Sequence, residues 1–94
     1  MFKSTIDYKI EKFLIKDESV MKLAIDVSEI LNKINKITIK GKGEFCPTTV
    51  SVANVITQNM LNGKTKTEIF VDSEILDDGR LIPTIEIIIT KINN

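Results

Sequence analysis

A short loop in which lysines alternate with glycines is the part of this sequence best suited to chemistry. Lys40, Gly41, Lys42 and Gly43 follow an apolar alternation and precede a helix expected to begin at Pro47. Such a loop presents backbone amides and ammonium groups together at a helix N-terminus, an arrangement that suits anions such as phosphate. We therefore predict an anion-binding loop here, although the two glycines could also serve only the tight turn.

The charges of the chain sum to zero but are unevenly distributed. The sequence has 13 Lys and Arg residues and 13 Asp and Glu residues. Between residues 33 and 66 Glu44 is the single acid among several lysines, whereas acids dominate from residue 68 onward. Because surface potential depends on local charge, a zero sum can conceal a basic stripe. A solvated mixture of charges is the alternative.

Other chemistry is not indicated by the sequence. One cysteine and no histidine cannot form a Cys/His zinc site in a monomer. We find no nucleophile–base pair and no nucleotide-binding fingerprint of sufficient length. Cys46 precedes a helix start, where a thiol pKa can fall, but without a partner base we interpret it as structural or incidental. We predict that the protein is not an enzyme and uses no metal, cofactor or small-molecule substrate.

Length and composition are those of one small globular domain. The 94 residues, 43% hydrophobic and 28% charged, predict a single domain spanning residues 1–94. Apolar runs are all far shorter than the roughly 18 residues needed to span a bilayer, and the N-terminus lacks the apolar block of a signal peptide. We expect an intracellular protein without a membrane partner.

Hydrophobic periodicity predicts the first half of the fold. Residues 8–16 read as a strand, and Ser19 is a plausible N-cap for the following helix. Residues 37–40 alternate as a second strand. The apolar face of the helix recurs at three- and four-residue steps and comprises Val20, Leu23, Ala24, Val27, Ile30 and Leu31.

The second helix is expected to run from Pro47 to the Asn62–Gly63 stop signal. Val52 and Val55 lie off its main stripe and suggest a partner surface. Its apolar face would comprise Val50, Ala53, Ile56, Met60 and Leu61.

Two strands are expected to complete the chain, at residues 68–76 and 84–90, joined by a turn at residues 77–80. The second of these is apolar on both pleat faces, as expected for a strand that is flanked on both sides and covered. The order is β-α-β-α-β-β, and a strand–helix–strand unit implies a parallel crossover. We predict an α+β two-layer sandwich: a four-stranded mixed sheet with both helices on one face.

With this order, the sequence resembles the Alba family of small DNA- and RNA-binding, chromatin-type proteins. The first strand and helix start, the segment Ile37-Thr-Ile-Lys-Gly-Lys-Gly, the second helix, and Asp78-Gly79-Arg80 followed by Thr84-Ile-Glu-Ile match in register. The resemblance implies a homodimer, or a heterodimer with a paralogue, that binds DNA, RNA or both. It implies phosphate contacts by Lys40, Lys42 and Gly43, with Lys16 beside them and Arg80 on a hairpin arm. It also implies a dimer interface containing Val52, Val55, Ile56 and Met60.

The sequence departs from the family pattern close to these lysines. Asp17 and Glu18 stand where many members carry two lysines, and Glu44 replaces an expected basic residue. Since each phosphate contact adds about one unit to the salt dependence of log K, losing several would weaken binding by roughly 10- to 1,000-fold. The alternative is therefore an Alba-like scaffold subunit that binds mainly protein, as in a ribonuclease P-type complex. The resemblance leaves open DNA or RNA, and a cytoplasmic, nucleoid-associated or nuclear location.

Overall fold

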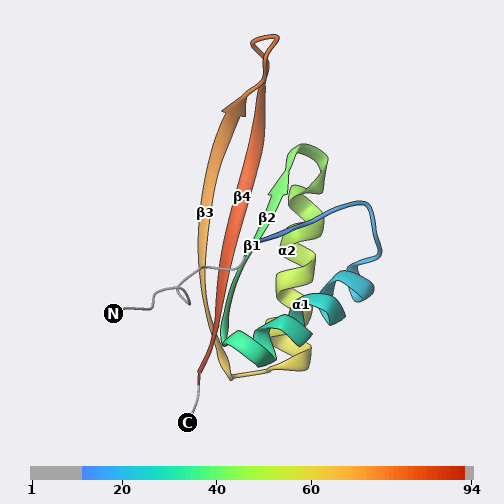
Figure 1. Cartoon of the computed structure of the whole chain (residues 1–94), viewed down its shortest axis with the longest axis vertical. Coiled ribbons are helices and arrows are strands. Elements are labelled where there is room, and N and C mark those ends of the chain that lie inside the picture. Colours follow the sequence, from blue (N-terminus) through green and yellow to red (C-terminus); the bar gives the residue numbers. More distant parts are fainter. Residues whose placement is uncertain (1–11, 93–94) are drawn as a thin grey trace, which may run out of the picture.

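The computed structural model describes residues 12–92, and this part of the chain forms four strands and two main helices (Figure 1). In none of its helices is there an apolar stretch long enough to cross a membrane. The elements are β1 (Lys12–Leu14), α1 (Val20–Ile34), β2 (Lys36–Lys42), α2 (Cys46–Asn54), β3 (Thr65–Ile75) and β4 (Leu81–Lys91), with a 3-10 turn η2 (Gly43–Phe45) before α2 and a π-helical segment η3 (Val55–Met60) after it.

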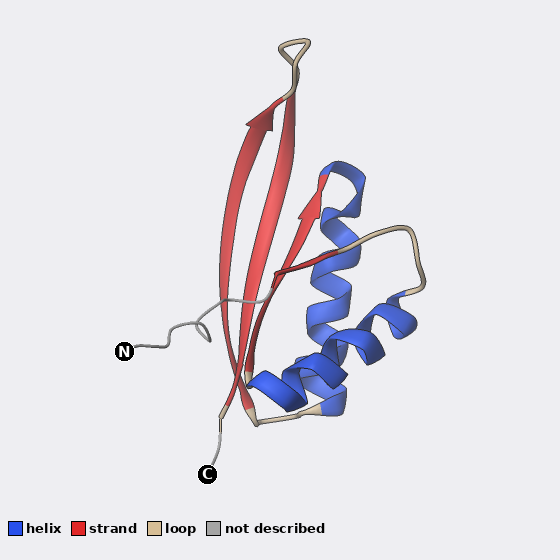
Figure 2. Ribbon diagram, viewed as in Figure 1, coloured by secondary structure: helices blue, strands red, loops and turns tan. Residues whose placement is uncertain are grey.

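The four strands form one mixed sheet in the order β1-β2-β4-β3. β1 is parallel to β2, and β4 is antiparallel to both β2 and β3. Both helices lie on one face of this sheet (Figure 2), which confirms the predicted α+β class, element order and layers. The predicted first strand is seen as β1, while its expected start at Tyr8 lies outside the described residues.

Helix α1 has the predicted cap and the predicted buried face. The Ser19 hydroxyl oxygen accepts a hydrogen bond from the backbone amide of Lys22 at 3.2 Å. The helix ends at Asn35, which adopts a left-handed φ of 66° and donates its amide to the Leu31 carbonyl at 2.8 Å. The fully buried side chains of α1 are Leu23, Ala24, Val27 and Leu31, which pack with isoleucines of β2 and β4.

The buried face of α2 differs from the prediction. Val50 was expected in the core but is 39% exposed, and Val52 was expected off the core stripe but is fully buried. The reason is Thr49, which occupies a core position because its hydroxyl donates to the Phe45 carbonyl at 2.8 Å. The true stripe recurs at helical spacing as Thr49, Val52, Ala53 and Ile56.

Gly41 allows α2 to approach β2 closely. A Cβ atom at this position would overlap the Thr49 hydroxyl and lie 2.8 Å from the Phe45 carbonyl oxygen. Gly43 has a different role: it has space around it but a φ of 57°, so it makes the turn into η2. The tight-turn interpretation therefore fits Gly43, whereas Gly41 is needed for helix–sheet packing.

The β3–β4 hairpin extends well beyond the rest of the sheet (Figure 1). Each of its strands has 11 residues, against 7 in β2, and each is longer than predicted. The helices pack on β2 and β4 and leave β3 largely exposed. The hairpin is thus a projecting arm with little cover from its own chain.

We expect Gly41→Ala to lower the free energy of unfolding in urea by about 1–3 kcal/mol, because the new methyl group overpacks the helix–sheet contact. Thr49→Ala removes the hydroxyl that the methyl would meet, so Gly41→Ala should cost less in that background. Gly43→Ala is the matched control: its cost of roughly 1–2 kcal/mol comes from backbone strain and should not change with Thr49→Ala. Strict additivity of Gly41→Ala and Thr49→Ala would contradict this account.

Candidate functional site

The parallel pairing of β1 and β2 brings two of the predicted basic residues together. Both strands end at the same edge of the sheet, where Lys16 and Lys42 line one surface pocket with Leu14, Ile15 and Phe45. Lys40 lies two residues before Lys42 in β2, so both side chains are on the same face of the sheet. This is the face away from the helices, because Ile39 and Gly41 occupy the buried, helix-side face. Gly43 follows at the start of η2.

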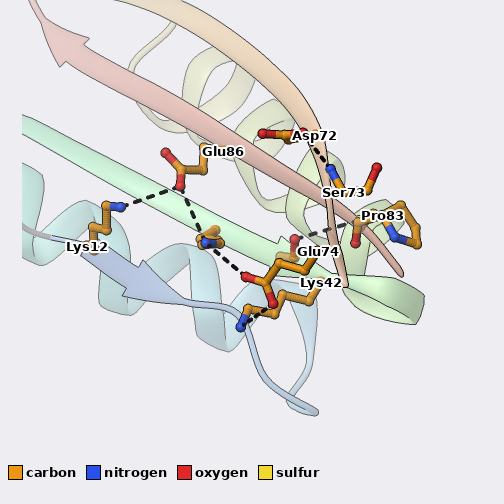
Figure 3. Close-up of polar contacts among 10 residues, drawn as sticks. Lys12, Lys42, Asp72, Ser73, Glu74, Pro83 and Glu86 are labelled. Carbon is orange, nitrogen blue, oxygen red and sulfur yellow. Dashed lines mark hydrogen bonds and ion pairs between the residues drawn. The ribbon is translucent and has the colours of Figure 1, made fainter. Parts of the chain in front are cut away.

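A continuous chain of ion pairs crosses this outer face of the sheet (Figure 3). Glu86 lies 3.4 Å from the Lys12 ammonium and 3.6 Å from that of Lys40. Glu74 lies 3.7 Å from Lys40 and 3.2 Å from Lys42. We call these five residues the ion-pair chain. Both lysines that were predicted to meet phosphate thus have carboxylate partners within their own chain.

Neither carboxylate of the ion-pair chain was identified as a site residue from the sequence. Glu86 stands directly opposite Lys40 in the β2–β4 ladder, so the strand register would have revealed it. Glu74 is harder to find because it reaches across β4 from β3, where its own ladder partner is Ile82. Such a contact depends on side-chain reach across two strands.

These pairs are weak enough for an anion to compete with them. The side chains of Lys42 and Glu74 are 41% and 39% exposed, and ion pairs at this level of exposure contribute only about 0–1 kcal/mol. Lys16 is exposed and forms no ion pair with any of residues 12–92. The site therefore retains mobile positive charge in spite of its acidic neighbours.

Three further acidic residues, those at which the sequence departs from the family pattern, lie close to the pocket lysines along the chain. Asp17 and Glu18 are exposed in the connection between β1 and α1, and Glu44 is exposed in η2. They flank the pocket lysines in sequence, so they lower the local positive potential. The charge around the pocket is therefore mixed rather than purely basic.

Arg80 lies apart from the other predicted residues, at the tip of the hairpin. The Asp78 carboxylate accepts hydrogen bonds from the Arg80 backbone amide at 3.1 Å and from its Nε at 2.7 Å. The Arg80 side chain is 72% exposed, so this pair shapes the turn without burying the guanidinium group. Arg80 therefore lies on a different part of the surface from Lys16, Lys40 and Lys42.

The residues predicted for a dimer interface are mostly occupied within the monomer. Val52 and Ile56 are fully buried, so neither offers surface to a partner, and Val55 and Met60 are half-buried against the core. Among residues 12–92, the four most exposed large apolar side chains lie instead on the hairpin. Ladder pairs put four of its side chains on the same sheet face as the buried isoleucines of β4. We call this the apolar arm face: Ile69, Val71, Ile75 and Leu81.

Cys46 and the acidic residues give no indication of a reactive centre. The Cys46 thiol lies 3.7 Å from the carbonyl oxygens of Gly41 and Pro83, consistent with a structural role. Among residues 12–92 there is no cluster of three or more Cys, Asp or Glu residues that could hold a metal ion. What the site offers chemically is exposed ammonium groups beside apolar surface.

Comparison with known proteins identifies the family. The family model described as Alba matches residues 11–72, more than half of the chain. The chain belongs to the Alba family. Alba proteins typically bind nucleic acid and form dimers, and they are generally binding proteins without enzymatic activity.

Two solved Alba structures share the fold. Alba from Thermoplasma volcanium is 24% identical, with a TM-score of 0.70 over 86% of this chain and 100% of that one. ALBA1 from Trypanosoma brucei is 13% identical, with a TM-score of 0.72 over 88% of this chain and 70% of that one. A search of curated proteins found no match. At these identities the likeness concerns the fold.

Proposed function

We propose that this Alba protein is a dimer that binds the phosphate backbone of nucleic acid at the sheet edge where β1 and β2 end. The observation that carries the proposal is the convergence of Lys16 and Lys42, from segments far apart in sequence, on one pocket. Gly43 and Lys40 extend this contact, and Arg80 supplies a second one at the hairpin tip. Lysine suits this role because its ammonium group is a mobile point charge.

Binding at this edge requires phosphate to replace carboxylate as the partner of lysine. A phosphate that reaches Lys42 displaces Glu74, and one that reaches Lys40 competes with both Glu74 and Glu86. The exchange costs little at Lys42, whose side chain and that of Glu74 are well exposed, and more at Lys40, whose side chain is only 23% exposed. It nevertheless makes binding weaker, and more easily abolished by salt, than binding by lysines without internal partners.

We expect the double variant Lys16→Gln/Lys42→Gln to bind duplex DNA or RNA more weakly and to lower the slope of log K against log salt by about two. Mobility-shift titrations at several salt concentrations measure this slope. Lys33→Gln/Lys64→Gln is the matched control, since these exposed lysines lie in the last turn of α1 and just before β3, near the end of the sheet where β2 and β3 begin. Equal losses in both variants would argue against this site, and absence of binding by the wild type at low salt would refute the proposed function.

Removal of an internal competitor should have the opposite effect. We expect Glu74→Gln to raise nucleic-acid affinity about five-fold, equivalent to about 1 kcal/mol, because Lys42 loses its carboxylate partner. Asp26→Asn is the matched control: it removes the same charge from an exposed ion pair on α1, where Asp26 contacts Lys22 at 3.1 Å. If both variants gain affinity equally, net charge rather than local competition is the cause.

The dimer would use the apolar arm face. Val71 and Ile75 are each 75% exposed although they lie on the helix-side face of the sheet, and exposed apolar patches of this kind mark interaction surfaces. The neighbouring half-buried Val55 and Met60 would add to the contact. A second copy of the chain offers the same surface, as the two-fold symmetry of a homodimer requires.

We expect light scattering to give the mass of two chains for the wild type and one chain for Val71→Asp, because a carboxylate in an apolar interface is costly to desolvate. Met21→Asp is the matched control, since Met21 is a 56% exposed apolar residue on α1, and it should remain dimeric. A wild-type mass of one chain would contradict the homodimer.

A second function is favoured by the ion-pair chain itself. If internal carboxylates satisfy the lysines permanently, the apolar arm face remains the main binding surface, and the chain acts as a scaffold subunit that pairs with a non-identical protein. In that case the wild-type chain would bind free nucleic acid poorly even at low salt, and the isolated chain would be monomeric or heterogeneous.

A further inference from the structure

We infer that the pocket between the end of β1 and η2 takes up an unpaired base of a single-stranded nucleic acid, while Lys16 and Lys42 hold the adjoining phosphate. The inference rests on the proposed function and narrows it to a class of ligand. Its basis is the composition of the pocket, which combines an apolar interior with two ammonium groups.

The pocket has the size and lining of a small-ligand site. Its volume of about 430 Å³ lies in the range of roughly 300–1,000 Å³ usual for such sites. Its surface is almost entirely apolar and is formed by Leu14, Ile15, Phe45 and parts of the two lysines. A phosphate gains nothing from this surface, whereas the faces of a base do. Bases in a duplex are stacked on one another, so the ligand must offer an unpaired base.

The aromatic wall of the pocket is fixed by the fold. Phe45 packs against the hydrophobic core, and its carbonyl oxygen accepts the Thr49 hydroxyl hydrogen bond at 2.8 Å. Leu14 lies on the edge strand β1 and is 54% exposed, so the opposite wall is open to a ligand. A prepositioned ring suits stacking because no ordering cost remains to be met on binding.

Charge distinguishes this pocket from its neighbour on the outer sheet face. That second pocket, of about 240 Å³, is lined by Lys40 and Phe70 together with the carboxylates of Asp72, Glu74 and Glu86. Three carboxylates around one ring repel the phosphate that accompanies any base in a strand. The pocket beside Lys16 has no carboxylate in its lining, so charge complementarity assigns the base to it.

The test compares two single strands by fluorescence anisotropy: a short oligothymidylate and a strand of equal length that is abasic throughout. Both carry the same phosphates. We expect the wild type to bind oligothymidylate about ten-fold more tightly, since stacking of one base changes affinity by roughly five- to 150-fold. Leu14→Ser and Phe45→Leu should bring this ratio close to one and leave binding of the abasic strand unchanged.

Controls separate this inference from the proposed function and from loss of folding. Ile25→Ser changes an exposed apolar residue on α1 and should keep the wild-type ratio. Leu14→Ser keeps the test valid if Phe45→Leu fails to fold, because Leu14 is largely exposed and its replacement should not disturb the core. Equal wild-type affinity for the two strands, or equal effects of Leu14→Ser and Ile25→Ser, would overturn the base pocket. If duplex DNA or RNA is still bound in that case, the proposed function stands without the base pocket. Absence of binding to every nucleic acid at low salt would refute both.

Discussion

The contact between α2 and β2 at Gly41 is the constraint on which the rest of the structure depends. Only a residue without a side chain lets Thr49 lie against the strand. That approach seats the stripe of α2 in the core and holds the Phe45 carbonyl through the Thr49 hydroxyl. Because η2 leads directly into α2, the same contact also fixes where Phe45 lies relative to the end of β2. The absence of a side chain at Gly41 therefore allows both the packing of α2 in the core and the arrangement of residues where β2 ends.

The outer face of the sheet carries both the lysines that a phosphate site needs and carboxylates that neutralise them. Lysines from β2 lie on this surface, yet β3 and β4 carry carboxylates that reach the same ammonium groups. Affinity for an anion then depends on a difference between two partners of similar strength rather than on the number of lysines. In a chain of zero net charge, an anion at this surface would have to compete with these carboxylates for the lysines.

Periodicity predicted the element order, the α1 cap and the layers, because these depend on local pattern and on burial of one face per element. It failed at Val50 and Val52. The polar Thr49 occupies a core position through its hydrogen bond, and a pattern of apolar residues alone does not include it in the buried stripe. The partners of Lys40 and Lys42 were missed because they depend on strand register and on side-chain reach across β4. The full length of the hairpin strands was missed because alternation does not show where a strand ends when both strands extend beyond the helices that cover them.

The position of β3 at the edge of the sheet gives its acidic residues another consequence. An edge strand has unpaired amides and carbonyls that can recruit a strand from another molecule, and charged side chains oppose this. Glu68, Asp72 and Glu74 line one face of β3, whose other face is the exposed apolar surface of the arm. Glu74 belongs to this acidic row and also pairs with Lys40 and Lys42. One carboxylate therefore both competes for the lysines and opposes the addition of a foreign strand at the free edge of the sheet.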